Sequence, residues 1–160
     1  MPVTVRCTVR RIPLRRTEIE RLAQRILGAT GEPLADVSLS FIGDASMRRL
    51  NRQYRRKDAP TDVLAFPMRH IRTRVTSHAS RFTSSMLGDV VISVPQAARQ
   101  ACERGLPLHH ELATLLIHGI LHLLGYDHER NLREAQRMQR KEQAVLRAIG
   151  PLLALVTRKG

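Results

Sequence analysis

A chain of 160 residues is long enough to bury one hydrophobic core, and we predict a single domain over residues 1–160. Because no run of about 18 apolar residues occurs and there are only two cysteines, neither a membrane-spanning helix nor a disulfide framework is expected, and a reducing cytoplasm fits. The formal net charge is +13, and 24 of the 27 basic residues are arginines, since lysine occurs only at positions 57, 141 and 159. Such an excess of arginine favours a polyanionic partner, with nucleic acid as the first choice, because guanidinium groups make paired hydrogen bonds to phosphate.

The first half of the chain contains two strand–helix pairs. Apolar and polar residues alternate over residues 3–9 and 37–41, which predicts two strands that each bury one face. A helix is expected after each strand. The first should begin with a capping box at Thr17–Glu20 and end at Gly28, and the second should be capped by Asp44. The inner face of the second helix is expected to comprise Met47, Leu50 and Tyr54.

The second half begins with two strands that we expect to pair antiparallel. They cover residues 63–66 and 87–94, and residues 69–86 between them are predicted to be a mobile connection because they lack periodicity. A helix should follow, since Pro95 fits a first helical turn and Gly105 fits a helix end.

Two further helices are predicted toward the end of the chain. The helix over residues 108–124 is apolar on nearly all sides, so we expect it to be the central buried helix. An amphipathic helix should span residues 130–148, and residues 157–160 should fray. The inner face of this last helix is expected to comprise Leu132, Ala135, Met138, Val145, Leu146 and Ile149. Together the elements predict an α+β fold, a small mixed sheet of four strands packed with about five helices.

The central helix carries the most informative motif, H-G-x-x-H-x-x-G-x-x-H, which starts at His118. His118 and His122 are four residues apart, so their imidazoles share one helix face and can bind one divalent ion. Gly125 can adopt the left-handed conformation that ends a helix, and the resulting turn would bring His128 to the same ion. Three histidines leave a coordination position open, which predicts one catalytic ion such as zinc, although imidazoles also suit nickel, copper and iron. The alternative is an apolar core helix whose histidines are satisfied by other partners.

Three motifs in the same order resemble those of the YbeY family of endoribonucleases. Residues 118–128 resemble the family signature, residues 50–67 its second motif and residues 87–93 its third. Element order and length also agree, and the resemblance covers nearly the whole chain. This chain departs from the family pattern at Arg56, where glycine is common, and at Ala65, where serine is common.

The resemblance implies a zinc-dependent endoribonuclease that is specific for single strands. Such proteins mature the 3′ end of 16S rRNA in the cytoplasm and take part in ribosome quality control. Carried over to this sequence, His118, His122 and His128 are the metal ligands, and Arg55 and His118 are catalytic residues. The implied partners are ribosomal RNA, small-subunit ribosomal proteins and the GTPase Era.

Arg55 belongs to three consecutive basic residues, 55–57, for which two interpretations stand side by side. An arginine here could hold an RNA phosphate and offset the charge that develops on it during attack by water or by the RNA 2′-hydroxyl. Cations at the end of a helix are also favoured without any ligand, so a solvated helix end is the alternative.

Two other functions share parts of the pattern. A zinc peptidase has the same histidine spacing, but it places a general-base glutamate where this chain has Gly119, which argues against peptide hydrolysis. A basic ribosome-assembly factor with a purely structural metal would also be consistent with the charge and the histidines.

The remaining polar residues near the motif receive no direct chemical role. Asp127 and Glu129 flank His128 and are interpreted as solvated carboxylates or as carboxylates that support the ligands. Glu111 is expected to be an exposed acid in the first turn of the central helix. Surface positions, with RNA contact as an option for the arginines, are expected for His70, His78, His109, His110, Arg69, Arg72, Arg74 and Arg81.

Overall fold

The computed structural model describes residues 3–68, 86–152 and 155–156. Its elements in chain order are β1 (Val3–Cys7), α1 (Arg16–Ala29), β2 (Asp36–Ile42), α2 (Asp44–Arg55), β3 (Val63–Pro67), β4 (Met86–Ser93), α3 (Val94–Arg104), α4 (Leu108–Leu123) and α5 (Leu132–Ile149). The predictions for residues 69–85, among them two histidines and four arginines, and for residues 157–160 lie outside the described part. No described helix is both long and apolar enough to cross a membrane.

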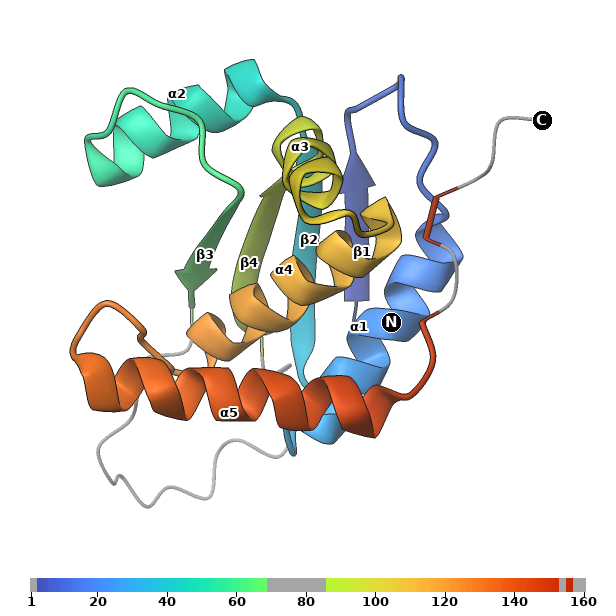
Figure 1. The fold of residues 1–160 in the computed structure, drawn as a ribbon, viewed down its shortest axis with the longest axis vertical. Helices are drawn as coiled ribbons and strands as arrows, with labels where there is room; N and C mark the ends of the chain where they lie inside the picture. The colour runs from blue at the N-terminus through green and yellow to red at the C-terminus, as the bar shows by residue number, and fades with distance from the viewer. Residues whose placement is uncertain (1–2, 69–85, 153–154, 157–160) are drawn as a thin grey trace.

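The described strands form one mixed sheet in the order β1-β2-β4-β3 (Figure 1). β1, β2 and β4 run parallel, with Leu39 of β2 between Val5 and Val90 of its neighbours. β3 pairs antiparallel with β4, as predicted, with Leu64 opposite Val91. Four strands and five helices in the described part confirm the predicted α+β fold with a small mixed sheet.

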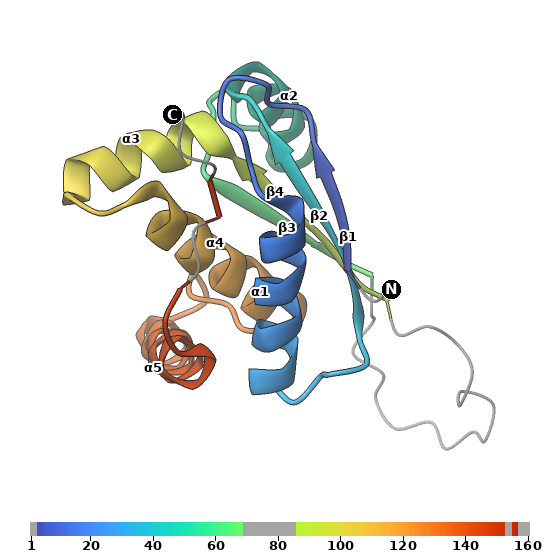
Figure 2. The same ribbon diagram turned by 90° about the vertical axis from the view of Figure 1, so that its right-hand side faces the viewer.

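Helices cover one face of the sheet in two layers (Figure 2). α1 and α4 lie against the strands, and α5 packs across both helices from outside. Strand alternation explains this arrangement. The side chains of Val37 and Leu39 in β2 point toward the helices and are each 1% exposed to solvent, while Ser38 between them points to the other face. Leu116 and Ile120 are 0% exposed, which confirms α4 as the central buried helix.

α2 covers a smaller part of the opposite face, at the end where β3 and β4 pair. Met47 of α2 packs there with Leu64 of β3 and Val91 of β4 in a second, smaller apolar cluster. Val91 faces this cluster because it alternates along β4 with Val90, which belongs to the main core. The last turn of α2 is thereby placed near β3, an edge strand of the sheet, where the ring of Tyr54 contacts Phe66.

Two glycines allow α4 to lie close to the paired strands β3 and β4. A Cβ atom on Gly119 would lie 2.5 Å from Cγ1 of Val90, so any side chain there would collide with the sheet. A Cβ atom on Gly88 would collide with the carbonyl oxygen of Phe66, and Gly88 has a φ of +145° that other residues rarely adopt. The close approach fixes which side of α4 faces the sheet and which side is left for other contacts.

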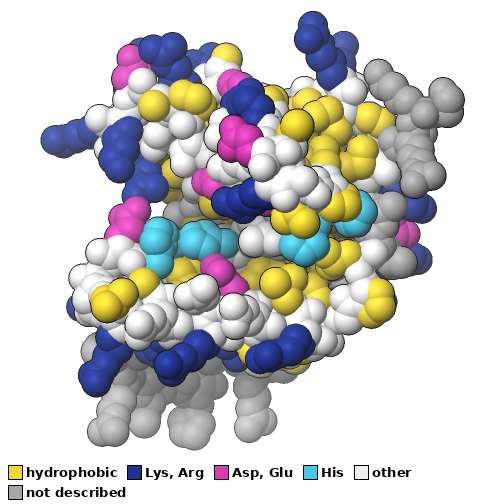
Figure 3. All heavy atoms as spheres, viewed as in Figure 1, with side chains coloured by type: hydrophobic (Ala, Val, Ile, Leu, Met, Phe, Trp, Pro, Cys, Tyr) yellow, Lys and Arg dark blue, Asp and Glu magenta, His cyan; other side chains and the backbone are white. Residues whose placement is uncertain are grey.

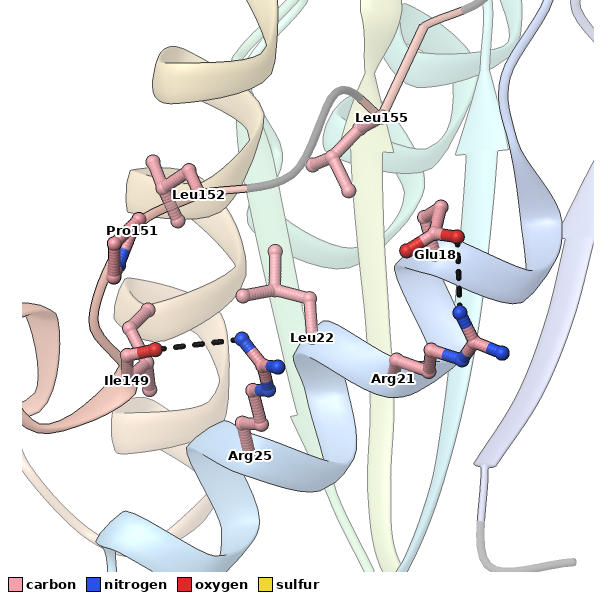
Figure 4. A pocket seen from close by; sticks show the side chains of 8 residues that line it. All are labelled: Glu18, Arg21, Leu22, Arg25, Ile149, Pro151, Leu152 and Leu155. Atoms are coloured by element: carbon pink, nitrogen blue, oxygen red, sulfur yellow. Dashed lines mark hydrogen bonds and ion pairs between the residues drawn. The ribbon is translucent and has the colours of Figure 1, made fainter.

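The chain after α5 returns over α1 (Figure 4). Leu152 and Leu155 lie on either side of Leu22 of α1, and Leu155 is 1% exposed. Arg25 donates a hydrogen bond of 3.5 Å to the carbonyl oxygen of Ile149, the last residue of α5. This end of the chain therefore fastens α5 to the first helix.

The predicted ends of the first helix were wrong. α1 begins at Arg16 and has no side-chain cap, so Thr17–Glu20 is not a capping box. Gly28 lies inside α1, which continues to Ala29. Backbone groups supply the hydrogen bonds at the C-terminal end instead. The backbone N–H of residue 30 donates to carbonyl oxygens in the last turn of α1, so Gly28 is not needed to end the helix.

Asp44 does not cap α2 as predicted. It is the first residue of the helix, and Gly43 occupies the capping position without a side-chain bond. The Asp44 carboxylate instead accepts hydrogen bonds from Ser93 at 3.0 Å and Arg99 at 2.9 Å. The Arg99 hydrogen bond lowers the pKa of Asp44, and these contacts tie α2 to the start of α3.

Two residues that were predicted to face inward are exposed. Leu132 is 74% exposed because it opens the first turn of α5, directly after Asn131, whose side chain caps that helix. Tyr54 is 58% exposed, and its ring meets the edge of Phe66 with the ring centres 5.1 Å apart. Helical periodicity therefore predicted the wrong exposure for these two residues, which lie in the end turns of their helices.

Candidate metal centre

The end of α4 presents two histidines, and the following turn adds a third. His118 and His122 lie one turn apart on the side of α4 that does not pack on the sheet. Gly125 has a φ of +98°, and the amides of Gly125 and Tyr126 donate to carbonyl oxygens of the last helical turn at 3.1 Å each. This reversal brings His128 beside the other two, as the sequence predicted.

The ring nitrogens of the three histidines converge on one point. Nε2 of His122 lies 3.0 Å from Nε2 of His118 and 3.1 Å from Nδ1 of His128. Two imidazoles that bind one zinc ion at about 2.0–2.1 Å with tetrahedral geometry have nitrogens about 3.3 Å apart. The donor type and the spacing therefore fit a single ion of this kind, and these three residues could hold it.

His122 is kept uncharged at neutral pH. Burial is the main cause that lowers the pKa of His122 to about 4, and the charges of His118 and His128 act in the same direction. The nearby Asp127 carboxylate has a smaller, opposite effect on this pKa. A neutral imidazole keeps a free lone pair, so His122 can serve as a ligand without first losing a proton.

Glu142 of α5 lies behind His118. Its Oε1 atom is 2.6 Å from Nδ1 of His118, and the two side chains are 22% and 26% exposed. When Nδ1–H donates to this carboxylate, the lone pair resides on Nε2, the nitrogen that faces His122. Carboxylates behind metal-binding histidines commonly fix the ring and its tautomer in this way.

The histidines open into a hollow of about 670 Å³, which we call the metal hollow. Residues 61–67 form one wall, His118 and His122 with residues 127–129 form the other, and Arg55 lies at the rim. Figure 3 shows histidine side chains exposed between α2 and α5, with charged side chains around them. The hollow is open to solvent.

Arg55 contacts Glu129 at the rim of the metal hollow. Nη2 of Arg55 lies 3.2 and 3.3 Å from the two carboxylate oxygens of Glu129. Oε1 of Glu129 also lies 3.9 Å from Nε2 of His128. The arginine singled out from the sequence thus lies beside the three histidines, and Glu129 connects it to them.

The segment that follows Arg55 is held by side chains of α2. Asn51 is 4% exposed and donates a 2.7 Å hydrogen bond to a carbonyl oxygen of this loop. Arg48 makes two hydrogen bonds to Asp58, of 2.8 and 3.0 Å. Arg56 ends α2 with a φ of +55°, a left-handed conformation that glycine adopts more easily. The hydrogen bonds of Asn51 and Arg48 fix the loop after α2, and they thereby hold the end of α2 that carries Arg55 in place.

Position 119 does not face the metal hollow. A Cβ atom on Gly119 would point between Val90 and Val63 of the sheet, 2.5 and 3.4 Å from their methyl carbons. The general-base glutamate of zinc peptidases would therefore have no room at this position.

A comparison with known families gives one clear match. The family model described as Endoribonuclease YbeY matches residues 5–150. The chain belongs to the YbeY endoribonuclease family. The family member "Endoribonuclease YbeY" of Geobacter metallireducens is 41% identical over 146 residues, which cover 91% of this chain and 93% of the relative. That of Pelotomaculum thermopropionicum is 49% identical over 129 residues, which cover 80% and 82%.

A solved structure has the same fold as this YbeY-family chain. The solution structure of TM1509 from Thermotoga maritima superposes with a TM-score of 0.60. The match covers 92% of this chain and 88% of that one, at 23% sequence identity. The likeness supports the architecture of the sheet and helices described above.

One residue that contacts one of the three histidines was missed in the sequence. Glu142 stands four residues after Met138 and three before Val145, on the face of the last helix that was predicted to be apolar. A single acid on such a face signals a buried partner, because a carboxylate is rarely buried without one. The structure shows that this partner is His118.

Other residues near the start of α4 differ from the sequence prediction. Glu111 is 1% exposed rather than solvated, and Arg104 donates two hydrogen bonds to it at 3.0 and 3.1 Å. His109 and His110 are half-buried, and Nδ1 of His110 has no hydrogen-bond partner among the described residues. Glu111, His109 and His110 do not line the metal hollow.

Proposed function

We propose that this chain is a single-domain, zinc-dependent endoribonuclease that cleaves single-stranded RNA. The observation that carries the proposal is that Arg55 and three convergent histidines line one open hollow. The net charge of +13 and the name of the relatives, Endoribonuclease YbeY, support RNA as the substrate. The proposed role is the maturation of the 3′ end of 16S rRNA, with a further part in ribosome quality control.

The proposed setting is the cytoplasm. Ribosomal RNA is the main partner in this proposal, together with small-subunit ribosomal proteins and the GTPase Era. A strongly basic chain fits such a setting because it associates readily with RNA-rich particles.

In the proposed reaction, His118, His122 and His128 hold one zinc ion. When bound, such an ion supplies Lewis acidity and lowers the pKa of water near it toward neutrality. Glu142 keeps His118 in the tautomer whose Nε2 faces the other ring nitrogens. The three imidazoles and this carboxylate are thus arranged in advance, without rearrangement during the reaction.

Arg55 is proposed to hold the scissile phosphate. Its guanidinium group can donate two parallel hydrogen bonds to the non-bridging oxygens and offset the negative charge that grows on them during attack. The nucleophile is either water or the RNA 2′-hydroxyl, and the product ends distinguish these routes. A 2′,3′-cyclic phosphate identifies attack by the 2′-hydroxyl.

The test compares His118→Ala and Arg55→Ala with the control Arg52→Ala. Arg52 is exposed on the same helix as Arg55 but does not line the metal hollow. We expect His118→Ala to stay folded but to lose bound zinc and cleavage of a single-stranded rRNA precursor fragment. We expect Arg55→Ala to keep its zinc and to cleave about 10²- to 10³-fold more slowly, while Arg52→Ala remains active.

Three outcomes would contradict parts of this proposal. Retained cleavage by verified zinc-free protein would remove the metal from the reaction, and equal cleavage of a matched duplex would remove strand specificity. Full rescue of rRNA processing in cells by His118→Ala would instead support a non-catalytic assembly factor. Gly119 and its contact with Val90 lend no support to a peptidase.

A further inference from the structure

The outer side of α5 borders a second hollow, distinct from the metal hollow. Its volume is about 570 Å³, and we call it the α5 groove. Of the described residues that line it, none is acidic and four are basic. The lining comprises Tyr126, Arg133, Gln136, Arg137, Arg140, Lys141 and Ala144. Figure 3 shows Lys and Arg side chains gathered along this edge of α5.

The basic residues of the α5 groove form a regular row. Residues 133, 137, 140 and 141 are spaced by four, three and one positions, which places them on one face of α5. The row extends for about 12 Å, because eight residues of an α-helix rise about 1.5 Å each. Met138 and Glu142 lie on the inner side of α5, whereas Arg133 and Arg140 of the row are exposed.

These cations are available for a ligand. Arg133, Arg140 and Lys141 form no ion pair within residues 3–68, 86–152 and 155–156. Arg137 is held in place, with its guanidinium carbon 5.1 Å from the centre of the Tyr126 ring and one nitrogen 3.8 Å from Glu134. Among the described residues, the groove therefore combines one anchored guanidinium with three cations that form no ion pair.

The α5 groove and the metal hollow share a boundary. Tyr126 lines the groove, whereas the next two residues, Asp127 and His128, line the metal hollow. The turn after α4 thus contributes lining residues to both spaces.

We propose that the α5 groove binds the phosphate backbone of the RNA strand next to the bond that is cleaved. This inference rests on the proposed function for the identity of the ligand. Planar guanidinium groups match phosphate oxygens, and a row of them follows a backbone without reading its bases. RNA is favoured over an anionic membrane because a membrane-binding face needs large apolar side chains beside its cations, and Tyr126 is the one large ring in the lining.

The test compares two triple variants that remove the same charge. The groove variant is Arg133→Gln with Arg140→Gln and Lys141→Gln. The control variant replaces the exposed residues Arg10, Arg11 and Arg16 with glutamine. Arg10 and Arg11 follow β1, which lies at the opposite edge of the sheet from β3, and Arg16 begins α1. None of the three lines the metal hollow. Zinc content and unfolding curves establish that both variants remain intact.

Binding is measured by stopped-flow fluorescence with zinc-loaded protein, before cleavage occurs. For a single-stranded RNA of about 16 nucleotides, we expect the groove variant to bind roughly tenfold more weakly than wild type. The slope of log affinity against log salt should fall by about 2, because each single-strand phosphate contact contributes about 0.7. The control variant should lose much less, and an RNA of about 4 nucleotides should bind both variants nearly equally.

Several outcomes would overturn the proposal. An unchanged groove variant, or a control variant that loses as much RNA affinity, would show that the groove makes no specific contact. Loss of binding to phosphatidylserine vesicles with unchanged RNA binding would assign the groove to a membrane. Cleavage is followed separately, so failure of every preparation to cleave RNA would refute the proposed function and leave the binding result interpretable.

Discussion

Arg55 of α2 and Glu129 of the turn after α4 form an ion pair at the rim of the metal hollow, with Nη2 of Arg55 3.2 and 3.3 Å from the two carboxylate oxygens. Both side chains are substantially exposed, at 39% and 59%, so the pair contributes little to stability. Its importance is positional. A phosphate that accepts a hydrogen bond from Nη2 of Arg55 competes there with the Glu129 carboxylate.

Glu129→Gln is therefore expected to strengthen RNA binding. Exposed ion pairs contribute about 0.2–1 kcal/mol, so the gain should be at most about fivefold in affinity. Glu103→Gln, an exposed acid of α3, is the control for net charge. Titrations of labelled single-stranded RNA give the affinities. In an Arg55→Ala background the two substitutions should have equal effects, and a persistent difference would show that Glu129 does not act through Arg55.

Glu142→Gln is expected to weaken zinc binding. The amide cannot match the carboxylate as an acceptor for Nδ1–H of His118, and loss of such supporting groups typically lowers metal affinity by about 10- to 100-fold. Glu134→Gln, two turns earlier on α5, is the matched control. Competition with a fluorescent zinc chelator measures both. Equal affinities in the two variants would contradict a role for Glu142 in orienting His118.

The metal-free protein should lose stability in mild acid. The pKa of His122 is about 4 when folded and near its ordinary value of 6.5 when unfolded. Between these values the unfolded state binds more protons, so the contribution of His122 is complete above pH 6.5 and declines as the pH falls to 4. The decrease in the free energy of unfolding should be on the order of 2–3 kcal/mol.

Urea unfolding of chelated protein over a pH series tests this expectation. His122→Asn should show a shallower dependence on pH than wild type. His109→Asn, which replaces a half-buried histidine outside the metal hollow, is the matched control. Parallel curves for wild type and His122→Asn would exclude His122 as the source of acid sensitivity.

Alanine at two helical glycines should change stability in opposite directions. Gly119→Ala places a methyl group 2.5 Å from Val90, and such overpacking costs about 1–3 kcal/mol, more than the gain of about 1 kcal/mol in helix propensity. Gly28→Ala in α1 meets no atom within 4 Å and should stabilise by about 0.5–1 kcal/mol. Denaturant midpoints compare the two variants. A stable Gly119→Ala protein would show that α4 can shift from the sheet.

Sequence spacing predicted those parts of the site that depend on one helix and one turn. The four-residue interval between His118 and His122 places them on one face, and Gly125 supplies the reversal that returns His128. The order of the elements likewise predicted the antiparallel pairing of β3 with β4, because one long hairpin connection joins these two consecutive strands. These features follow from local geometry, so they can be read from neighbouring residues.

Contacts between distant segments could not be predicted in the same way. Glu142 is 24 residues from His118, and Glu129 is 74 residues from Arg55, so no local period connects the partners. The same limitation explains the error at Glu111. Its position in a first helical turn suggested that Glu111 is exposed to solvent. Packing of α3 against α4 instead buries its carboxylate, which pairs with Arg104.

The contact between Glu142 and His118 has a consequence for the turnover of the protein in the cell. It joins α5 to α4 at the metal centre, so an ion held by His118 also favours the docked position of α5. A ligand present at 100 times its dissociation constant stabilises the folded state by about 2.7 kcal/mol. Zinc starvation should therefore expose α5 to proteases and shorten the protein's half-life, which would couple the amount of this chain to metal supply.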